Sequence, residues 1–321
     1  MVANFGIGTL ALVITGWDAA PWEARFRAAA PGRDIRLWPD RLGNPDDVAY
    51  AATWLPPDGA FAAFKNLRAI FSLGAGVDGV LKDRALPQVP LVRVVDPNLM
   101  RRMTEYVTLH VLMHHRRQRL YDAQQRQRVW HEHPQPRANE VAVGIMGLGV
   151  LGHDAAEVLV RLGFQVAGWS RSPRQLPGIE CFHGAAGLDA FLARTEILVC
   201  LLPHTPATEG ILDLALMRKL KRDGALGGAF LINAGRGKLQ VDADIAAALD
   251  EGTLAGATLD VFPTEPLPAT SPLWTNPKVT ITPHNSAASV PEEVVAYIVR
   301  QIERLEAGEG LENVIDRTSG Y

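Results

Sequence analysis

The stretch VAVGIMGLGVLG, residues 141–152, contains the pattern that decides how this chain folds. Its first half is an apolar run typical of a buried parallel strand. Gly147, Gly149 and Gly152 follow that run directly, and the apolar positions after them recur with helical spacing. A strand, a glycine-rich turn and a helix in this order predict a unit that binds a dinucleotide.

The three glycines are expected to have different physical roles. The first permits a tight turn, the second lets the backbone approach a pyrophosphate, and the third lets the helix pack closely on the strand. The pyrophosphate would lie at the positive N-terminus of the helix. We therefore expect the cofactor to be bound by Gly147, Gly149, Val150, Leu151 and Gly152. An ordinary strand-to-helix turn is the alternative.

The segment GWSRSPR, residues 168–174, indicates which dinucleotide is bound. Units of this kind normally place an acidic residue at the end of the second strand, where it binds the adenosine ribose. This chain has Ser170, Arg171, Ser172 and Arg174 there. Hydroxyl and guanidinium groups can bind a 2'-phosphate, which a carboxylate would repel. The segment predicts NADP, with NAD as the weaker alternative, unless these arginines are only solvated loop charges.

Two sets of apolar runs, within residues 10–95 and 141–261, alternate with helix-like segments. Crossovers of this length predict parallel sheets that are covered by helices on both faces. A chain of 321 residues is also too long for one ordinary core, which stops growing near about 250 to 300 residues. We therefore predict an α/β protein with two Rossmann-like, doubly wound parallel sheets.

Two long helices are expected outside these sets. One runs from about residue 100 to 130. The other runs from about 289 to 308, where Ser289 and Glu292 form a capping box and apolar residues recur on one face. This last helix needs a core, and we expect it to return to the first domain, which would make that domain discontinuous.

Composition limits the partners. The chain has 32 basic and 35 acidic residues, a formal charge of -3, so no global field attracts nucleic acid or an anionic membrane. The apolar run between Phe5 and Thr15 is too short to span a bilayer. Two cysteines cannot form a disulfide framework, which favours a cytoplasmic location. The expected partners are small molecules or further copies of the chain.

A second glycine pattern follows another predicted strand, at Gly74, Gly76 and Gly79. Because Pro87 and Pro90 come too soon for a full helix, this loop is expected to form an anion-binding nest of backbone N–H groups. A plain tight turn is the alternative.

His110 and His114 stand four residues apart on the first long helix, a spacing that would suit zinc. No carboxylate or cysteine pattern accompanies them. We therefore predict no metal site and expect solvated or capping histidines.

Three ionisable residues further along each follow an apolar run, namely Arg236, Glu265 and His284. Open parallel sheets bind their ligands at the carboxyl ends of the strands. An arginine can hold a carboxylate with two parallel bonds, a histidine can deliver a proton, and a glutamate beside it favours the charged imidazole. Singly, each could be a surface ion pair or cap. After a dinucleotide loop, the three together predict carbonyl reduction.

The order and spacing of these motifs resemble the D-isomer-specific 2-hydroxyacid dehydrogenase family, most closely its glyoxylate/hydroxypyruvate reductase A branch. The similar motifs are LGAGVD, GIMGLGVLG, INAGRG, LDVFPTEPLP, SPLW, TPH and the closing GY. The resemblance covers almost the whole chain. It departs from the family in the longer approach to Arg236, MRKLKRDGALGGAFLINAGRG.

This resemblance implies a two-domain enzyme. Residues 1–104 and 289–321 would form the substrate domain, and residues 105–288 the dinucleotide-binding domain. Family members are commonly dimers built through the cofactor domain, so a homodimer is expected.

The resemblance also implies roles for individual residues. Arg236, Glu265 and His284 would be catalytic, with His284 as the proton donor and Glu265 as its partner. The other implied contacts are Ala75 and Gly76 to the substrate carboxylate, Trp54 to the substrate pocket, and Asp260 to the nicotinamide amide.

The implied activity is reduction of short 2-oxo acids by NADPH, from glyoxylate to glycolate and from hydroxypyruvate to D-glycerate. One alternative is a reductase of a bulkier 2-oxo acid such as phenylpyruvate. Another is a nucleotide-sensing binding protein, since corepressors of the C-terminal binding protein type resemble the same fold.

Overall fold

The computed structural model describes residues 8–74 and 76–317, which form two compact units. The first unit ends at Leu99 and resumes at Ser289, and the second comprises Met100–Ala288. The boundary expected between residues 104 and 105 lies in the same helix as the observed one, α3, Pro97–His115.

The first unit contains a five-stranded parallel sheet with the order β2-β1-β3-β4-β5. Helices α1 and α9 pack on one face, and α2 with the neighbouring turns covers the other. Helix α2 is only one turn long, as the nearby prolines predict. The elements are β1 Thr9–Ile14, α1 Ala20–Ala29, β2 Ile35–Leu37, β3 Val48–Trp54, β4 Ala69–Ser72, α2 Asp78–Leu81, β5 Leu91–Val92 and α9 Pro291–Glu306.

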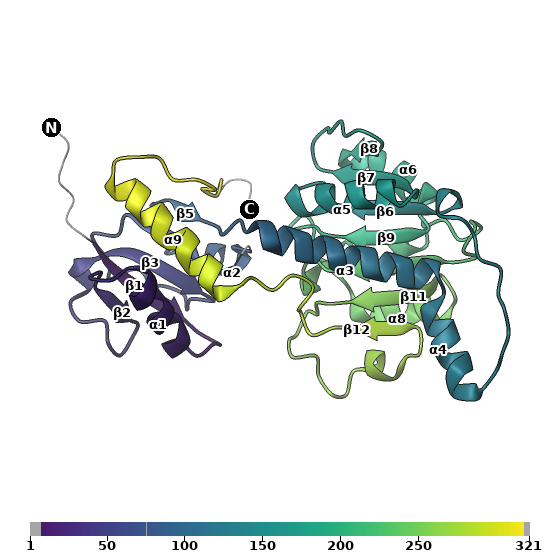
Figure 1. The fold of residues 1–321 in the computed structure, drawn as a ribbon, viewed down its shortest axis with the longest axis horizontal. Helices are drawn as coiled ribbons and strands as arrows, with labels where there is room; N and C mark the ends of the chain where they lie inside the picture. Colours follow the sequence, from purple (N-terminus) through teal and green to yellow (C-terminus); the bar gives the residue numbers. More distant parts are fainter. Residues whose placement is uncertain (1–7, 75, 318–321) are drawn as a thin grey trace. The chain divides into compact units, whose positions relative to one another are not determined.

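The second unit contains a seven-stranded parallel sheet with the order β12-β11-β10-β9-β6-β7-β8. Helices α3 and α5 cover one face, and α6 and α8 cover the other (Figure 1). The short helix α7 packs in the same core as α6 and α8. The strands are β6 Ala142–Met146, β7 Gln165–Ser170, β8 Glu180–His183, β9 Ile197–Cys200, β10 Ala229–Asn233, β11 Leu254–Leu259 and β12 Val279–Ile281. The helices after α3 are α4 Gln118–Gln127, α5 Val150–Arg161, α6 Gly184–Arg194, α7 Leu214–Met217 and α8 Asp242–Asp250.

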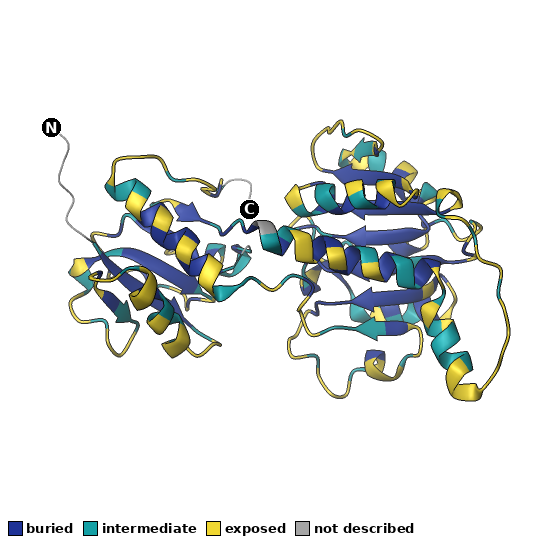
Figure 2. Ribbon diagram, in the orientation of Figure 1, coloured by how far each residue is buried: buried dark blue, intermediate teal, exposed yellow. Residues whose placement is uncertain are grey.

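The predicted fold class, two doubly wound parallel sheets with a discontinuous first domain, is confirmed. Strands β1 and β6 are buried along their whole length, because helices cover both faces of each sheet (Figure 2). Among the described residues, no helix is long and apolar enough to cross a membrane.

The strand order of the second unit reverses beside β6. The chain moves from β6 outward to β7 and β8, and then returns to the other side of β6 to add β9. Ligands of doubly wound sheets bind at such a switch point, outside the carboxyl ends of the strands. The fold therefore places a ligand site next to the loop that follows β6.

The prediction of one continuous helix over residues 100–130 is wrong, because the structure has two helices there. Helix α3 ends at His115, Arg117 has a φ of +55°, and α4 begins at Gln118. Several side chains of α3 are buried in the core, whereas α4 has no buried residue. The change from an apolar to an arginine- and glutamine-rich sequence therefore coincides with the break.

The predicted capping box is also wrong. Helix α9 begins at Pro291, its N-cap is Val290, and no side chain caps it. Ser289 lies one residue too early for the cap position. The carboxylate of Glu292 instead pairs with Arg25 of α1, at 2.7 Å.

The expectation that His110 and His114 are solvated or capping is wrong, because both side chains are buried. Nε2 of His114 lies 3.0 Å from Oγ1 of Thr258. Burial lowers the pKa of His110 to about 4 and that of His114 to about 3, so both are neutral at ordinary pH. Within the described part of the chain, no group of three or more potential ligands could hold a metal ion.

Candidate active site

The predicted site residues of the second unit follow successive strands of its sheet. Gly147 comes after β6, Ser170 ends β7, Arg236 comes after β10, Asp260 after β11 and His284 after β12. Because all these strands are parallel, their carboxyl ends lie along one edge of the sheet. The fold thus brings Gly147 and His284, which are 137 positions apart in the sequence, to the same edge of the sheet.

The glycine turn after β6 is closely packed at its first and third glycines. Gly147 has a φ of +107°, and a Cβ there would lie 2.8 Å from the carbonyl oxygen of Leu201. A Cβ on Gly152 would lie 1.9 Å from the carbonyl oxygen of Gly147, so helix α5 could not approach the turn with a larger residue. At Gly149, by contrast, no described atom lies within 4 Å of a built Cβ, which leaves room for a ligand.

The N-terminus of α5 suits an anionic group. Gly149 is its N-cap, and no side chain caps the first turn. The N–H groups of Val150, Leu151 and Gly152 belong to this turn, where a helix has no internal acceptors for them. These donors and the positive end of the helix fit the pyrophosphate of a dinucleotide.

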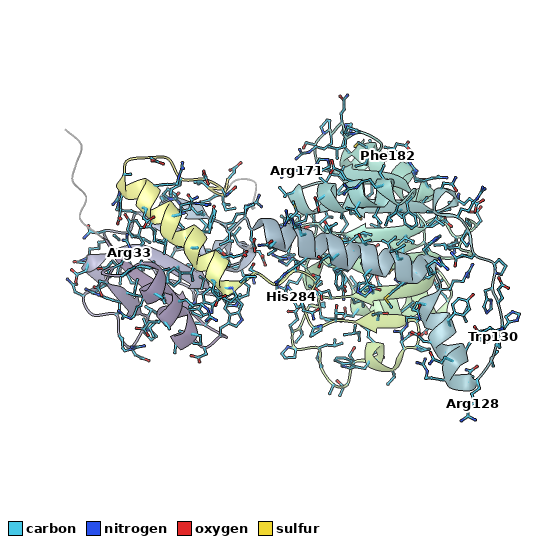
Figure 3. The ribbon with its side chains drawn as sticks, viewed as in Figure 1. Arg33, Arg128, Trp130, Arg171, Phe182 and His284 are labelled. Carbon is cyan, nitrogen blue, oxygen red and sulfur yellow. The ribbon has the colours of Figure 1, made fainter. Side chains whose placement is uncertain are left out.

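The loop after β7 contains the residues expected to bind a 2'-phosphate. Ser170 is buried, and its hydroxyl donates to the carbonyl oxygen of Ser172 at 2.8 Å. Arg171, Ser172 and Arg174 are exposed, and Figure 3 labels Arg171 at the surface of this unit. Arg171, Ser172 and Arg174 are therefore the accessible members, while Ser170 shapes the loop.

His284 and Glu265 form a hydrogen-bonded pair. Nδ1 of His284 lies 2.7 Å from Oε2 of Glu265, and Oε1 of Glu265 accepts the backbone N–H of Phe262 at 2.9 Å. The side chain of His284 is 47% exposed. Since Nδ1 is bonded to Glu265, Nε2 is the ring nitrogen that can donate a proton to a substrate.

The pair shifts both pKa values toward the charged forms. The hydrogen bond to Glu265 raises the pKa of His284 and outweighs the opposing effect of burial. Burial raises the pKa of Glu265, but the hydrogen bonds from His284 and Phe262 bring it below its ordinary value. The positive charge of Arg236 lowers the pKa of both groups, so this guanidinium acts directly on the pair.

Arg236 is half-buried on a loop that its neighbours hold in place. The side-chain amide of Asn233 donates to the carbonyl oxygen of Arg236 at 3.2 Å and to Oε1 of Gln240 at 2.7 Å. A Cβ on Gly237 would lie 1.9 Å from the carbonyl oxygen of Phe262. Only glycine permits this approach, which brings the Arg236 loop against the segment that leads to Glu265.

Asp260 is completely buried at the end of β11. Its Oδ1 accepts the hydroxyl of Thr282 at 2.6 Å and the backbone N–H of Asn285 at 2.9 Å, and its Oδ2 accepts the N–H of Ser286 at 3.1 Å. The Asp260 carboxylate therefore bonds the Thr282 side chain before His284 and the backbone after it. Its contact with a nicotinamide amide stays a prediction.

The remaining predicted site residues belong to the first unit. The ring of Trp54 stacks on that of Trp17, with centroids 4.1 Å apart, and a Cβ on Gly74 would lie 2.6 Å from the Trp54 ring. The carbonyl oxygen of Gly76 accepts the hydroxyl of Ser72 at 3.1 Å. The first unit thus brings Trp54 against the glycine loop, while Ala75 lies outside the described residues.

Sequence reasoning missed several residues that order the site, above all Asn233 and Thr282. Both occur in the quoted motifs INAGRG and TPH. A polar residue at the end of a buried strand was the available signal, because its side chain can bond the loop that follows.

Comparison with known proteins places this site in a family. The family described as "D-isomer specific 2-hydroxyacid dehydrogenase, NAD binding domain" matches residues 108–286, more than half of the chain. The chain belongs to the D-isomer-specific 2-hydroxyacid dehydrogenases. The resemblance stated from its motifs and the predicted enzyme class are confirmed.

Similar proteins cover nearly the whole of this dehydrogenase. Glyoxylate/hydroxypyruvate reductase A of Escherichia fergusonii is 42% identical over 95% of this chain and 97% of its own. A probable 2-hydroxyacid dehydrogenase from Rhizobium etli, solved with NADP, HEPES and L(+)-tartaric acid, is 45% identical, with a TM-score of 0.93 over 98% of this chain and 100% of its own. An NADPH-dependent glyoxylate/hydroxypyruvate reductase from Sinorhizobium meliloti, solved with NADP and sulfate, is 45% identical, with a TM-score of 0.91 over the same shares.

Proposed function

We propose that this dehydrogenase is an NADPH-preferring reductase of short 2-oxo acids, which converts glyoxylate to glycolate and hydroxypyruvate to D-glycerate. The observation that carries the proposal is the His284–Glu265 pair, under the charge of Arg236, at the sheet edge that also bears the glycine turn. Relatives named as glyoxylate/hydroxypyruvate reductases support this substrate class. They favour an enzyme over a nucleotide-sensing binding protein.

The chain's own residues would divide the chemistry as follows. NADPH, when bound, supplies a hydride to the keto carbon. Arg236 would hold the substrate carboxylate or its keto oxygen through a guanidinium fork. His284 would give the proton on Nε2 to the keto oxygen, while Glu265 keeps the ring oriented and favours its protonated form. Trp54, Ala75 and Gly76 are proposed to contact the substrate.

The proton donor predicts a pH dependence. Reduction requires protonated His284, whose pKa is raised in this structure. Activity should therefore be high below that pKa and fall as the pH rises through it. Glu265→Gln removes the charge that raises the pKa, so the falling limb of the kcat/KM profile should move to lower pH.

A matched variant controls this measurement. Glu292→Gln removes a carboxylate of the first unit that pairs with Arg25. The falling limb of the kcat/KM profile should stay at the wild-type pH in this variant. A limb that does not move in Glu265→Gln would argue against the pairing as the source of the pKa shift.

Cofactor preference is proposed to come from the loop after β7. Arg171 and Arg174 are exposed there, and no acidic residue occurs between Gly168 and Arg174. The solved relatives with NADP support binding of the phosphorylated cofactor. A charge-assisted hydrogen bond contributes roughly 1.5 to 3 kcal/mol, so Arg171→Ala should lower the preference for NADPH over NADH by about 10- to 150-fold.

The measurement is the ratio of kcat/KM with the two reduced cofactors. Arg161→Ala removes an exposed arginine from the far end of α5 and should leave that ratio unchanged. Ser170→Asp should lower the ratio further than Arg171→Ala, because a carboxylate repels the phosphate and can bind the ribose of NADH. Equal ratios in Arg171→Ala and the wild type would remove Arg171 from the phosphate site.

A homodimer is proposed as well. Trp130, just after α4, is fully exposed at 102% (Figure 3). Val129 and Leu120 are exposed as well. Exposed aromatic side chains such as Trp130 are enriched at interfaces between proteins. A second copy would cover them. Sedimentation equilibrium that gives the mass of one chain at micromolar concentration would contradict this.

A cytoplasmic location is proposed from chemistry. The reaction consumes reduced nicotinamide, which the cytoplasm regenerates, and both cysteines are free thiols. Cell fractionation that finds the protein outside the cytoplasm would contradict it.

A further inference from the structure

A chain of hydrogen-bonded side chains connects helix α3 to the segment that carries His284. The hydroxyl of Tyr106 lies 2.7 Å from Oγ1 of Thr282, and that oxygen lies 2.6 Å from Oδ1 of Asp260. Tyr106 is 9% exposed and Asp260 is fully buried. These hydrogen bonds join three elements, because Tyr106 lies on α3, Asp260 follows β11 and Thr282 follows β12.

The direction of these bonds follows from the groups involved. The Asp260 carboxylate already accepts the N–H groups of Asn285 and Ser286, so it acts as an acceptor. Thr282 has one hydroxyl proton and donates it to Asp260. The Thr282 oxygen can then only accept from Tyr106, whose pKa is raised by burial, so that the phenol keeps its proton.

Asp260, the last residue in this series of hydrogen bonds, fixes the backbone around His284. The backbone N–H of His284 donates to the main-chain oxygen of Asp260 at 2.8 Å. His284 has a φ of +52°, in the left-handed region that non-glycine residues seldom adopt. Such a conformation persists only where the surroundings determine it. Here the surroundings are the N–H groups of residues 285 and 286 and the hydroxyl of Thr282, all of which donate to the Asp260 carboxylate.

We propose that Tyr106 is a positioning residue for His284, which acts through Thr282 and Asp260 to hold the imidazole where it can protonate the substrate. Its role in reduction rests on the proposed function, but its effect on the loop does not. The ring of Tyr106 belongs to the buried cluster of Met103 and Val107 and lies 4.2 Å from the ring of His110, and a phenylalanine ring keeps these ring contacts. The hydroxyl is therefore the part that serves the site.

Hydrogen exchange tests the anchoring without any activity. In Tyr106→Phe, the amides of Thr282 and of residues 284–286 should exchange about 2- to 13-fold faster, the loss of one neutral hydrogen bond of roughly 0.5 to 1.5 kcal/mol. Tyr297→Phe is the control, since it removes a buried hydroxyl that bonds Asn313 in the other unit. Unchanged exchange at Thr282 and at residues 284–286 in Tyr106→Phe, or an equal increase there in Tyr297→Phe, would overturn the proposal.

Kinetics test the consequence for His284. Tyr106→Phe should lower kcat for glyoxylate by a similar factor, while the Kd for NADPH changes less than twofold. Thr282→Val should lower kcat by a similar factor, whereas Thr282→Ser, which keeps the hydroxyl, should keep most of the activity. The double variant Tyr106→Phe with Thr282→Val should lower kcat little further than either single variant, because both substitutions break the same series of hydrogen bonds.

A last variant separates this proposal from the function itself. In His284→Gln, adding Tyr106→Phe should leave the residual rate unchanged, because the tyrosine acts through His284. If His284→Gln is fully active, the proposed proton donor is wrong. If His284→Gln is impaired but Tyr106→Phe keeps the wild-type kcat, the proton donor stands and the positioning role is overturned.

Discussion

His284→Gln is expected to lower the turnover of glyoxylate by about 100- to 10,000-fold, the usual contribution of a positioned general acid. Glutamine keeps a polar side chain of similar reach but has no ionisable proton to give to the keto oxygen. The imidazole is 47% exposed and bonded to Glu265 through Nδ1, so Nε2 is the donating atom that the variant removes. The measurement is kcat at a pH below the falling limb.

Binding of NADPH should survive this change, because the glycine turn and the loop after β7 follow other strands of the sheet. A Kd for NADPH within about twofold of the wild type would show that the variant is folded. His131→Gln, which replaces an exposed histidine after α4, should keep full turnover. Wild-type turnover in His284→Gln would refute the assignment of the proton donor.

Arg236→Lys is expected to lower kcat/KM for glyoxylate by on the order of 100- to 1,000-fold, as the loss of a preorganised donor to a developing oxyanion does. Lysine keeps the charge but cannot present two parallel N–H groups to a carboxylate. The backbone of the Arg236 loop is fixed by Asn233 and by the close approach of Gly237 to Phe262, and Nη1 of Arg236 donates to the carbonyl oxygen of Gly235 at 2.8 Å.

The same substitution at Arg161, which is exposed at the end of α5, should have no effect on kcat/KM. Because lysine preserves the field that acts on His284, the pH profile of Arg236→Lys should keep its falling limb. Wild-type efficiency in Arg236→Lys would mean that Arg236 contributes only a positive field.

Patterns that depend on neighbouring residues in the chain were predictable from the sequence. The strand before Gly147 and the helix after Gly149 could be identified, because burial on both faces demands continuous apolar runs and helical spacing needs no tertiary information. The order Arg236, Glu265, His284 after successive strands could be read in the same way. The parallel sheet then brings their carboxyl ends to one edge.

Features set by distant neighbours were not predictable. The bond of Tyr106 to Thr282 joins residues 176 positions apart, and no local pattern distinguishes that tyrosine from an ordinary core aromatic. The capping box at Ser289 failed for a similar reason. A Ser-x-x-Glu pattern fits a helix start, but Pro291 and the pairing of Glu292 with Arg25 moved the start of α9 past it.

The break after α3 and the burial of His114 also needed the structure. The arginines and glutamines of residues 116–128 have good helix propensity, so local preference alone favours one continuous helix. His114 is a core residue, and its Nε2 lies within hydrogen-bond distance of the hydroxyl of Thr258, on a strand far along the chain.

The most direct test of the account is the glyoxylate-dependent oxidation of NADPH and of NADH by the purified protein, expressed as the ratio of the two kcat/KM values. The account predicts rapid oxidation of NADPH and a ratio of about ten or more, because the exposed arginines of the loop after β7 favour the 2'-phosphate and no carboxylate opposes it. No glyoxylate-dependent oxidation of NADPH, or a ratio at or below one, would contradict it.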